Sequence, residues 1–77
     1  MPTFPTVDES LDRLRRAGWS VGDTAFGPPH ARVWQVTGTN GENAVVAYGR
    51  FQAAAWWGAC EQARAVGMLA PPQPRER

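Results

Sequence analysis

Several residue types and sequence patterns are scarce or missing in this chain of 77 residues, and each absence excludes a class of protein. The only cysteine is Cys60, which excludes an internal disulfide and favours a reducing compartment. No apolar run approaches the roughly 20 residues of a membrane-spanning helix. The N-terminal MPTFPTVDES has neither the basic region nor the apolar region of a signal peptide. We therefore expect a cytoplasmic protein with no membrane partner.

Lysine is absent, and histidine occurs once, at His30. Eight arginines against seven acidic residues give a formal net charge of +1, so the whole molecule is not a cation that attracts polyanions. One cysteine and one histidine at distant positions do not make a metal site. Paired carboxylates, a glycine-rich phosphate loop and a serine-centred elbow are all missing. We expect no catalysis, no bound metal and no small-molecule cofactor.

The chain is long enough for one domain, near the lower size limit at which a core is stable alone. The 43% apolar content and four tryptophans suffice for one modest core. We expect a short lead-in at residues 1–5 and a single domain at residues 6–69. The proline-rich residues 70–77 are expected to be a disordered tail.

A first helix is predicted from about residue 7 to residue 17, where Gly18 ends it. Thr6 and Glu9 have the spacing of a capping box, which satisfies the first backbone N–H groups of a helix. Apolar residues recur at helical spacing, so they share one face: Val7, Leu11 and Leu14. The opposite face pairs acids with bases four residues later, at Glu9–Arg13 and Asp12–Arg16.

Three antiparallel strands are predicted at about residues 19–26, 32–38 and 43–48. Asn40-Gly41 is a strong signal for a type I′ hairpin turn between the last two strands. That turn pairs Thr39 with Glu42, Val36 with Val45, Trp34 with Ala47, and Val33 with Tyr48. Side chains alternate across a strand, so the hairpin has two faces. One face holds Trp34, Val36, Val45 and Ala47, and the other holds Val33, Gln35, Thr37, Ala44, Val46 and Tyr48. The first is the better core face, but the second is far from polar.

A second helix is predicted from about residue 52 to residue 66, ending at Gly67. Its small apolar stripe allows close approach to the sheet: Ala55, Ala59, Ala63 and Val66. Met68 and Leu69 fit the hydrophobic contact of a Schellman cap. The predicted fold class is α+β with the order α-β-β-β-α, in which both helices pack on one face of a three-stranded antiparallel sheet.

This order, together with two sequence elements, resembles the double-stranded RNA-binding domain. The family carries a GPxHxxxF element before its second strand, and this chain has Gly27-Pro28-Pro29-His30-Ala31-Arg32-Val33-Trp34. The family's last helix opens G-x-S-K-K-x-A-K, and the same frame here is Gly49-Arg50-Phe51-Gln52-Ala53-Ala54-Ala55-Trp56. The resemblance covers roughly residues 7–69.

The resemblance implies an RNA contact at the loop histidine, His30, and another on the outer face of the first helix, at Arg15 and Arg16. Arg50 and the N–H groups at the start of the last helix are further candidates for an anion contact. The family's phosphate-clamping lysines are replaced, since their positions hold Gln52, Ala53 and Trp56. Phosphate contacts dominate nucleic-acid affinity, so the loss of three should weaken RNA binding by orders of magnitude.

Two adjacent tryptophans, Trp56 and Trp57, stand where the family has its RNA-facing rim. Neighbouring helical residues lie about 100° apart, so both cannot point at the centre of the sheet. Trp57 shares its face with Glu61 and Arg64 and is expected to be exposed. Tryptophan is enriched among the residues that dominate protein interfaces. Stacking on unpaired bases and packing within the domain are alternatives.

We therefore expect a non-catalytic protein-interaction module, with a protein partner or a second copy of the chain. The residues expected to supply the contact are Trp56, Trp57, Val33, Val46 and Tyr48. The alternative is binding to structured, double-stranded RNA through His30, Arg15, Arg16 and Arg50.

Overall fold

A computed structural model of the chain describes residues 3–73. Its elements are α1 (Val7–Arg16), β1 (Ser20–Phe26), the 3-10 turn η1 (Pro29–Ala31), β2 (Val33–Asn40), β3 (Asn43–Gly49) and α2 (Gln52–Ala65). The α-β-β-β-α order expected from the sequence is confirmed, and no predicted boundary of a helix or strand differs from these by more than two residues.

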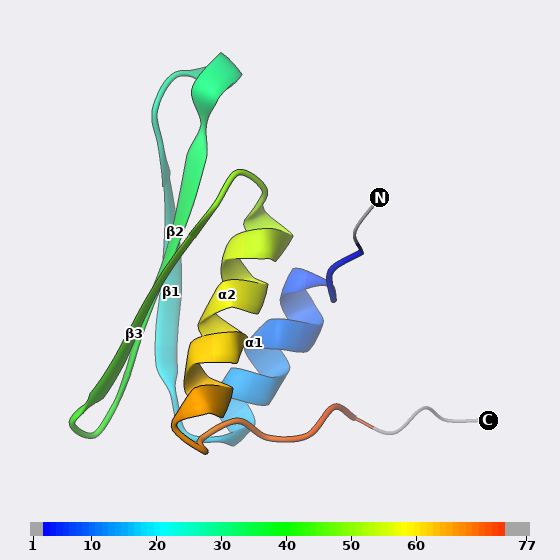
Figure 1. The fold of residues 1–77 in the computed structure, drawn as a ribbon, viewed down its shortest axis with the longest axis vertical. Coiled ribbons are helices and arrows are strands. Elements are labelled where there is room, and N and C mark those ends of the chain that lie inside the picture. Colours follow the sequence, from blue (N-terminus) through cyan, green and yellow to red (C-terminus); the bar gives the residue numbers. More distant parts are fainter. Residues whose placement is uncertain (1–2, 74–77) are drawn as a thin grey trace.

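The three strands form one antiparallel sheet in the order β1-β2-β3, so β1 and β3 are both edge strands. Both helices lie on the same side of the sheet, and the other side is uncovered (Figure 1). The second helix packs over β3 and β2, whereas the first packs against α2 and the beginning of the sheet at β1. Neither helix within residues 3–73 has the length and apolar character needed to cross a bilayer.

Both helices begin and end as their sequences predict. The Thr6 hydroxyl accepts from the Glu9 N–H at 3.1 Å, and the Glu9 carboxylate accepts from the Thr6 N–H at 2.8 Å, which completes the capping box. At the end of α2, the Met68 N–H donates to the Ala63 carbonyl and the Gly67 N–H to the Arg64 carbonyl. This is the Schellman arrangement, and Gly67 has the positive φ of 75° that it requires.

The hairpin turn differs from the prediction. Asn40 pairs with Asn43, so the two loop residues are Gly41 and Glu42. Gly41 has φ +65°, whereas no residue other than glycine has positive φ among residues 3–73, so the type I′ prediction is wrong. Asn40 belongs to β2 because its side chain donates to the carbonyl of Ala17 at 2.9 Å, at the end of α1.

Because of this turn, each β2 residue pairs two positions further along β3 than predicted. Val36 lies opposite Ala47 instead of Val45, and Trp34 lies opposite Gly49. Side chains alternate with a period of two, so a shift of two positions leaves every residue on its predicted face. The predicted register is wrong, but the predicted division into a core face and an outer face is correct.

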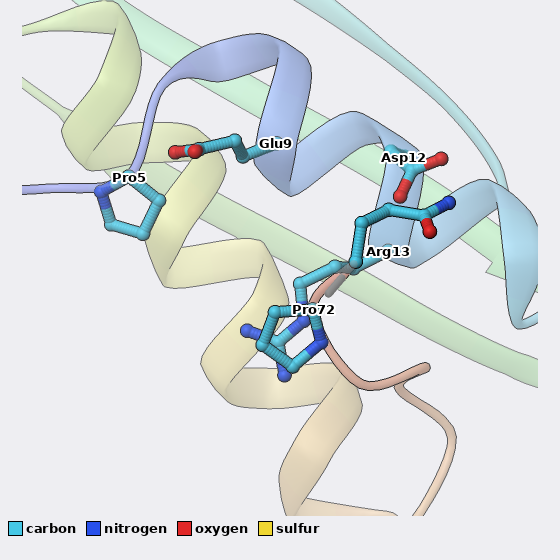
Figure 2. A pocket seen from close by; sticks show the side chains of 6 residues that line it. Pro5, Glu9, Asp12, Arg13 and Pro72 are labelled. Atoms are coloured by element: carbon cyan, nitrogen blue, oxygen red, sulfur yellow. The ribbon is translucent and has the colours of Figure 1, made fainter. Parts of the chain in front are cut away.

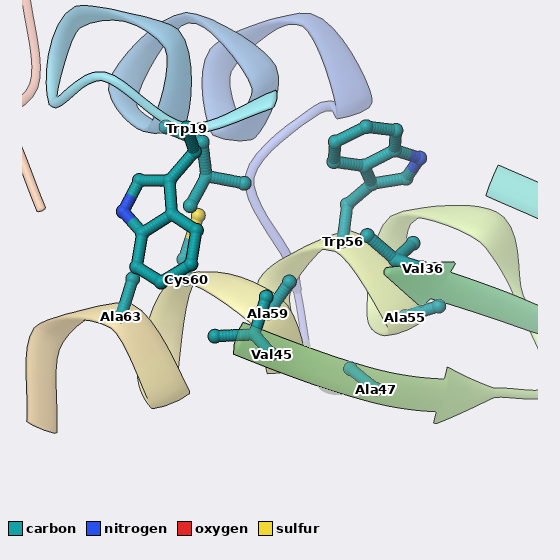
Figure 3. Close-up of a cluster of buried hydrophobic side chains, with 10 residues drawn as sticks. Trp19, Val36, Val45, Ala47, Ala55, Trp56, Ala59, Cys60 and Ala63 are labelled. Atoms are coloured by element: carbon teal, nitrogen blue, oxygen red, sulfur yellow. The ribbon is translucent and has the colours of Figure 1, made fainter. Parts of the chain in front are cut away.

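The core lies between the sheet and the two helices (Figure 3). Its buried members come from α1, β2, β3, α2 and the α1–β1 turn. They are Leu14, Trp19, Val36, Val45, Ala47, Ala55, Trp56, Ala59, Cys60 and Ala63. The alanines of α2 let the helix backbone approach the strands closely, and Gly58 lies directly over Ala47. Trp19 and Trp56 fill the two ends of the space along α2 (Figure 3).

The C-terminal segment is attached to the domain beyond the predicted boundary at residue 69. The Trp19 indole donates to the Met68 carbonyl at 2.7 Å, and the Arg13 guanidinium donates to the Ala70 carbonyl at 2.8 Å. The Arg16 guanidinium donates to the Pro71 carbonyl. The expected tail therefore begins with residues that lie on α1. Residues 74–77 of that tail and residues 1–2 of the lead-in lie outside the described residues.

Candidate functional site

The uncovered face of the sheet carries eleven side-chain positions, and none of them is charged. The strand registers assign to it Ser20, Gly22, Thr24 and Phe26 of β1, Val33, Gln35, Thr37 and Thr39 of β2, and Ala44, Val46 and Tyr48 of β3. We call these residues the open face. Solvated faces of antiparallel sheets are usually polar, and charged residues there prevent association. An uncharged open face is therefore suited to contact with another surface.

The open face carries three large side chains, all mainly apolar, that are exposed to solvent. Phe26 is 46% exposed, Val46 is 44% exposed and Tyr48 is 58% exposed. Val33 is half-buried on the same face. A shallow depression surrounds Gly22 between the flanking threonines and serine of β1 and β2. Of the predicted contact residues, the structure therefore brings Val33, Val46 and Tyr48 together on one surface.

The polar groups of the open face are mostly hydroxyls, which both donate and accept hydrogen bonds. The Gln35 amide donates to the Tyr48 hydroxyl at 3.1 Å across the β2–β3 pair. That bond leaves the Tyr48 hydroxyl proton and the Gln35 carbonyl oxygen free to bond elsewhere. Because donors and acceptors lie side by side, the face can satisfy the polar groups of a copy of itself.

The prediction that Trp56 lies at a surface is wrong. Its side chain is 4% exposed, and its indole N–H donates to the Asp23 carboxylate at 3.0 Å. Asp23 lies on the helix-facing side of β1 and gives this buried indole a partner, which a sequence pattern does not reveal. Trp57 was expected to be exposed but is half-buried, because it packs against the edge of the core. Neither tryptophan is part of the open face.

Two of the four predicted RNA contacts, His30 and Arg50, lie in one concavity. It is formed by η1 and the β3–α2 connection, and its lining residues are Pro29, His30, Ala31, Arg32, Arg50 and Phe51. This basic concavity holds two arginines and no acidic residue. The first turn of α2, which starts beside it, has neither a side-chain cap nor an acidic residue. Phe51 is 71% exposed, more than any other large apolar side chain within residues 3–73.

The other two predicted RNA contacts, Arg15 and Arg16, lie in the last turn of α1. That turn is at the opposite end of the helical layer from η1 (Figure 1). Arg15 is exposed, whereas Arg16 pairs with Asp12 at 2.9 Å and also donates to Pro71. The structure therefore does not bring Arg15 and Arg16 together with His30 and Arg50.

A groove runs between the N-terminal segment, α1 and the C-terminal segment (Figure 2). Its lining residues are Pro5, Glu9, Asp12, Arg13, Pro72 and Gln73. The charged groups in it already have partners, because Glu9 caps α1, Asp12 pairs with Arg16 and Arg13 binds the Ala70 carbonyl. The predicted Glu9–Arg13 pair is replaced by these contacts. We do not place a ligand in this groove.

Cys60 is fully buried between α1 and α2, and its thiol donates to the Ser10 carbonyl at 3.6 Å. Burial raises the pKa of the Cys60 thiol above its ordinary value, which keeps it protonated and unreactive at neutral pH. Among residues 3–73, no three histidine, cysteine or acidic side chains are grouped so that they hold a metal ion.

Sequence reasoning missed Phe26, Arg32 and Phe51, although each has a signal in the sequence. Along β1, Phe26 lies an even number of residues from the other open-face positions, so strand alternation places it on that face. Arg32 and Phe51 each lie within two residues of a predicted RNA contact, His30 or Arg50. Comparison with family models, with curated proteins and with solved structures finds no match to this chain.

Proposed function

We propose that this protein is a non-catalytic protein-interaction module whose contact surface is the open face. The single observation that carries the proposal is that one whole side of the sheet is both uncovered and free of charge, although 19% of all residues are charged. Removing apolar groups from water is favourable, and burying a hydroxyl costs much less than burying a charged group, so this is the surface most easily buried.

The partner that best fits the open face is a second copy of the chain. A two-fold symmetric interface brings the same surface of two molecules together, so a surface that carries charge of one sign repels its own copy. The open face has no such charge, and its hydroxyls, the Gln35 amide and the Tyr48 hydroxyl are self-complementary. We infer that two copies stack their sheets, with helices on the outside.

The size of the face limits the strength of this contact. Three strands of seven or eight residues cover roughly 350 Å², from the usual strand spacing and rise. Stable complexes bury about 800 Å² on each partner. We therefore expect weak association, with a dissociation constant of about 100 μM or higher unless loop residues such as Phe26 and the η1 turn add to the contact.

Sedimentation tests this proposal. The average mass of the natural chain should rise with concentration toward that of a dimer, and Val46→Asp should weaken association about tenfold or more by placing a carboxylate in the contact. Val66→Asp is the matched control, because Val66 is 53% exposed against 44% for Val46 but lies at the end of α2. Self-association that both variants leave unchanged would exclude the open face. A natural chain that stays monomeric at millimolar concentration would exclude the second copy as partner.

A second candidate function is binding to structured RNA, which the resemblance to double-stranded RNA-binding domains implies. The observation that favours it is the basic concavity, where Arg32 and Arg50 flank His30 with no acidic residue among the lining side chains. The buried position of Trp56 and the partners of Arg16 reduce the number of groups available for such contacts. We therefore give it second place.

A gel shift with duplex RNA at low salt tests the second candidate. Binding should weaken steeply with salt, and Arg32→Ala with Arg50→Ala should reduce the slope of log affinity against log salt by about 2. Arg15→Ala is the control, since it removes another exposed arginine, in the last turn of α1. Absence of a shift at tens of micromolar protein, or equal loss in the control, rules out the concavity as an RNA site.

A further inference from the structure

The outward backbone groups are hydrogen-bonded differently at the two edge strands of the sheet, β3 and β1. On the outer edge of β3, the Val46 N–H donates to the Gln62 side-chain oxygen at 3.1 Å, and the Gln62 amide donates to the Val46 carbonyl at 2.6 Å. The side-chain amide of α2 thus occupies the position that the backbone of a fourth strand would take. Unpaired strand edges are sites for pairing with other chains, and this contact closes the middle of the β3 edge, at Val46.

The same contact identifies the free backbone groups at the other edge. In an antiparallel pair, alternate residues direct both N–H and C=O toward the neighbouring strand. The backbone N–H and C=O of Val46 point away from β2, so those of its partner Thr37 point toward β1. The residue of β1 opposite Thr37 is Gly22. The backbone groups of Gly22 therefore point toward β2. The backbone N–H and C=O groups that point away from the sheet belong to Val21, Asp23 and Ala25. Within residues 3–73, no side chain forms a hydrogen bond with the backbone of these three residues.

Asp23 makes the β1 edge chemically distinctive, because it is the one charged side chain on β1. Its carboxylate accepts from the Gln52 amide at 2.7 Å and from the Trp56 indole at 3.0 Å, and both donors are neutral. No salt bridge to Asp23 forms within residues 3–73, and the residue is exposed. An uncompensated carboxylate therefore lies in the middle of an unpaired edge.

We propose that the β1 edge accepts one extended segment of a partner protein, which pairs with Val21, Asp23 and Ala25 and carries an arginine or lysine opposite Asp23. Directly opposite residues of adjacent strands have Cβ atoms about 5 Å apart, within reach of an ion pair. Backbone hydrogen bonds give such strand addition its affinity, and the side chain opposite Asp23 gives it specificity. A β1 strand from a second copy brings a second Asp23 and is a poorer partner.

The closed β3 edge limits this mode of binding to one strand. A sheet with two open edges propagates into a fibre, because every added chain presents a new edge. Here Gln62 blocks head-to-tail addition from β1 of one molecule to β3 of the next. The binding site is separate from the open face, so the inference goes beyond the proposed function and does not depend on it.

Two capped heptapeptide probes test the inference, Thr-Val-Thr-Arg-Thr-Val-Thr and the same peptide with Glu in place of Arg. Titrated into the full chain, the Arg probe should shift the backbone amide NMR signals of Val21, Asp23 and Ala25 and slow their hydrogen exchange. It should bind several-fold more tightly than the Glu probe. Asp23→Asn keeps an acceptor for Trp56 and should remove that preference, which added salt should also reduce.

A pair of proline variants locates the site. Ala25→Pro removes an outward N–H without breaking the ladder to β2, and should weaken the Arg probe about tenfold. Ala44→Pro makes the same change on the outer edge of β3 and should leave binding unchanged. The inference is overturned if neither probe binds at 1 mM, if Ala44→Pro weakens binding as much as Ala25→Pro, or if the three amides become protected with protein concentration alone. If Ala25→Pro does not fold, the positions of the shifted amides in the natural chain decide.

Discussion

Replacement of Trp56 with alanine should reduce the free energy of unfolding by about 4 kcal/mol. The side chain is buried at one end of the core, and truncation of a buried tryptophan typically costs about 3–5 kcal/mol. It also removes the indole N–H that binds Asp23. A domain of this size has a total stability of about 4–12 kcal/mol, so the change removes a large part of it. With an m-value of about 1 kcal/mol per M, the urea midpoint should fall by about 4 M.

The neighbouring tryptophan provides a matched control. Trp57→Ala makes the same chemical change one residue later, at a half-buried position, and should cost about 1 kcal/mol. Trp56→Phe keeps most of the volume but not the bond to Asp23, and should lie between the two alanine variants. Equal losses for Trp56→Ala and Trp57→Ala in urea unfolding would contradict the positions of the two indoles.

The order of the elements was predictable because each has local signals. The Thr6–Glu9 capping box, Gly18 and Gly67 mark three helix ends, and these contacts form within a few residues along the chain. The hairpin register was not predictable from the turn signal alone. The Asn40 side chain donates a hydrogen bond to the carbonyl of Ala17, which lies 23 residues earlier in the sequence. This contact keeps Asn40 in β2, so the loop residues are Gly41 and Glu42.

The site was predictable in part, for the same reason. Val33, Val46 and Tyr48 share a face in either register, because the predicted and observed pairings differ by an even number of residues. The position of Trp56 depends on Asp23, and the state of the β3 edge depends on Gln62, each through a contact between distant residues. Side-chain contacts of this kind have no periodicity, so the sequence does not show them.

The distribution of charge separates the surfaces of this small domain. In α1, Asp12 pairs with Arg16, and Arg13 and Arg16 bind carbonyls of the C-terminal segment, whereas the open face has no charge and β1 has only Asp23. The proposed protein contact on the open face and the proposed strand addition at the β1 edge therefore leave the helical layer in water. Such an arrangement allows both contacts on one molecule, and Val46→Asp and Ala25→Pro should each affect only one of them.

Gly49→Ala should reduce the free energy of unfolding by about 3 kcal/mol and lower the melting temperature by roughly 12–24 °C. A Cβ atom at Gly49 would lie 2.6 Å from the Ala55 backbone nitrogen and 3.1 Å from both the Ala55 Cα and the Phe51 carbonyl oxygen. These are backbone atoms of the first turn of α2, so a side-chain rotation cannot relieve the clash. The strand and the helix must separate, which opens the core beside Trp34 and Ala55.

Gly22→Ala makes the same change in another strand and should have the opposite sign. A Cβ atom there has no neighbour within 4 Å, and Gly22 does not have a positive φ. Alanine restricts the unfolded chain more than glycine does, so this variant should gain about 0.4–1 kcal/mol. Calorimetry of Gly49→Ala and Gly22→Ala compares how the same added methyl group changes the melting temperature in two strands of one sheet. A melting temperature that falls equally in both would mean that the helix does not approach Gly49 closely, and that strand glycines here act only through the backbone.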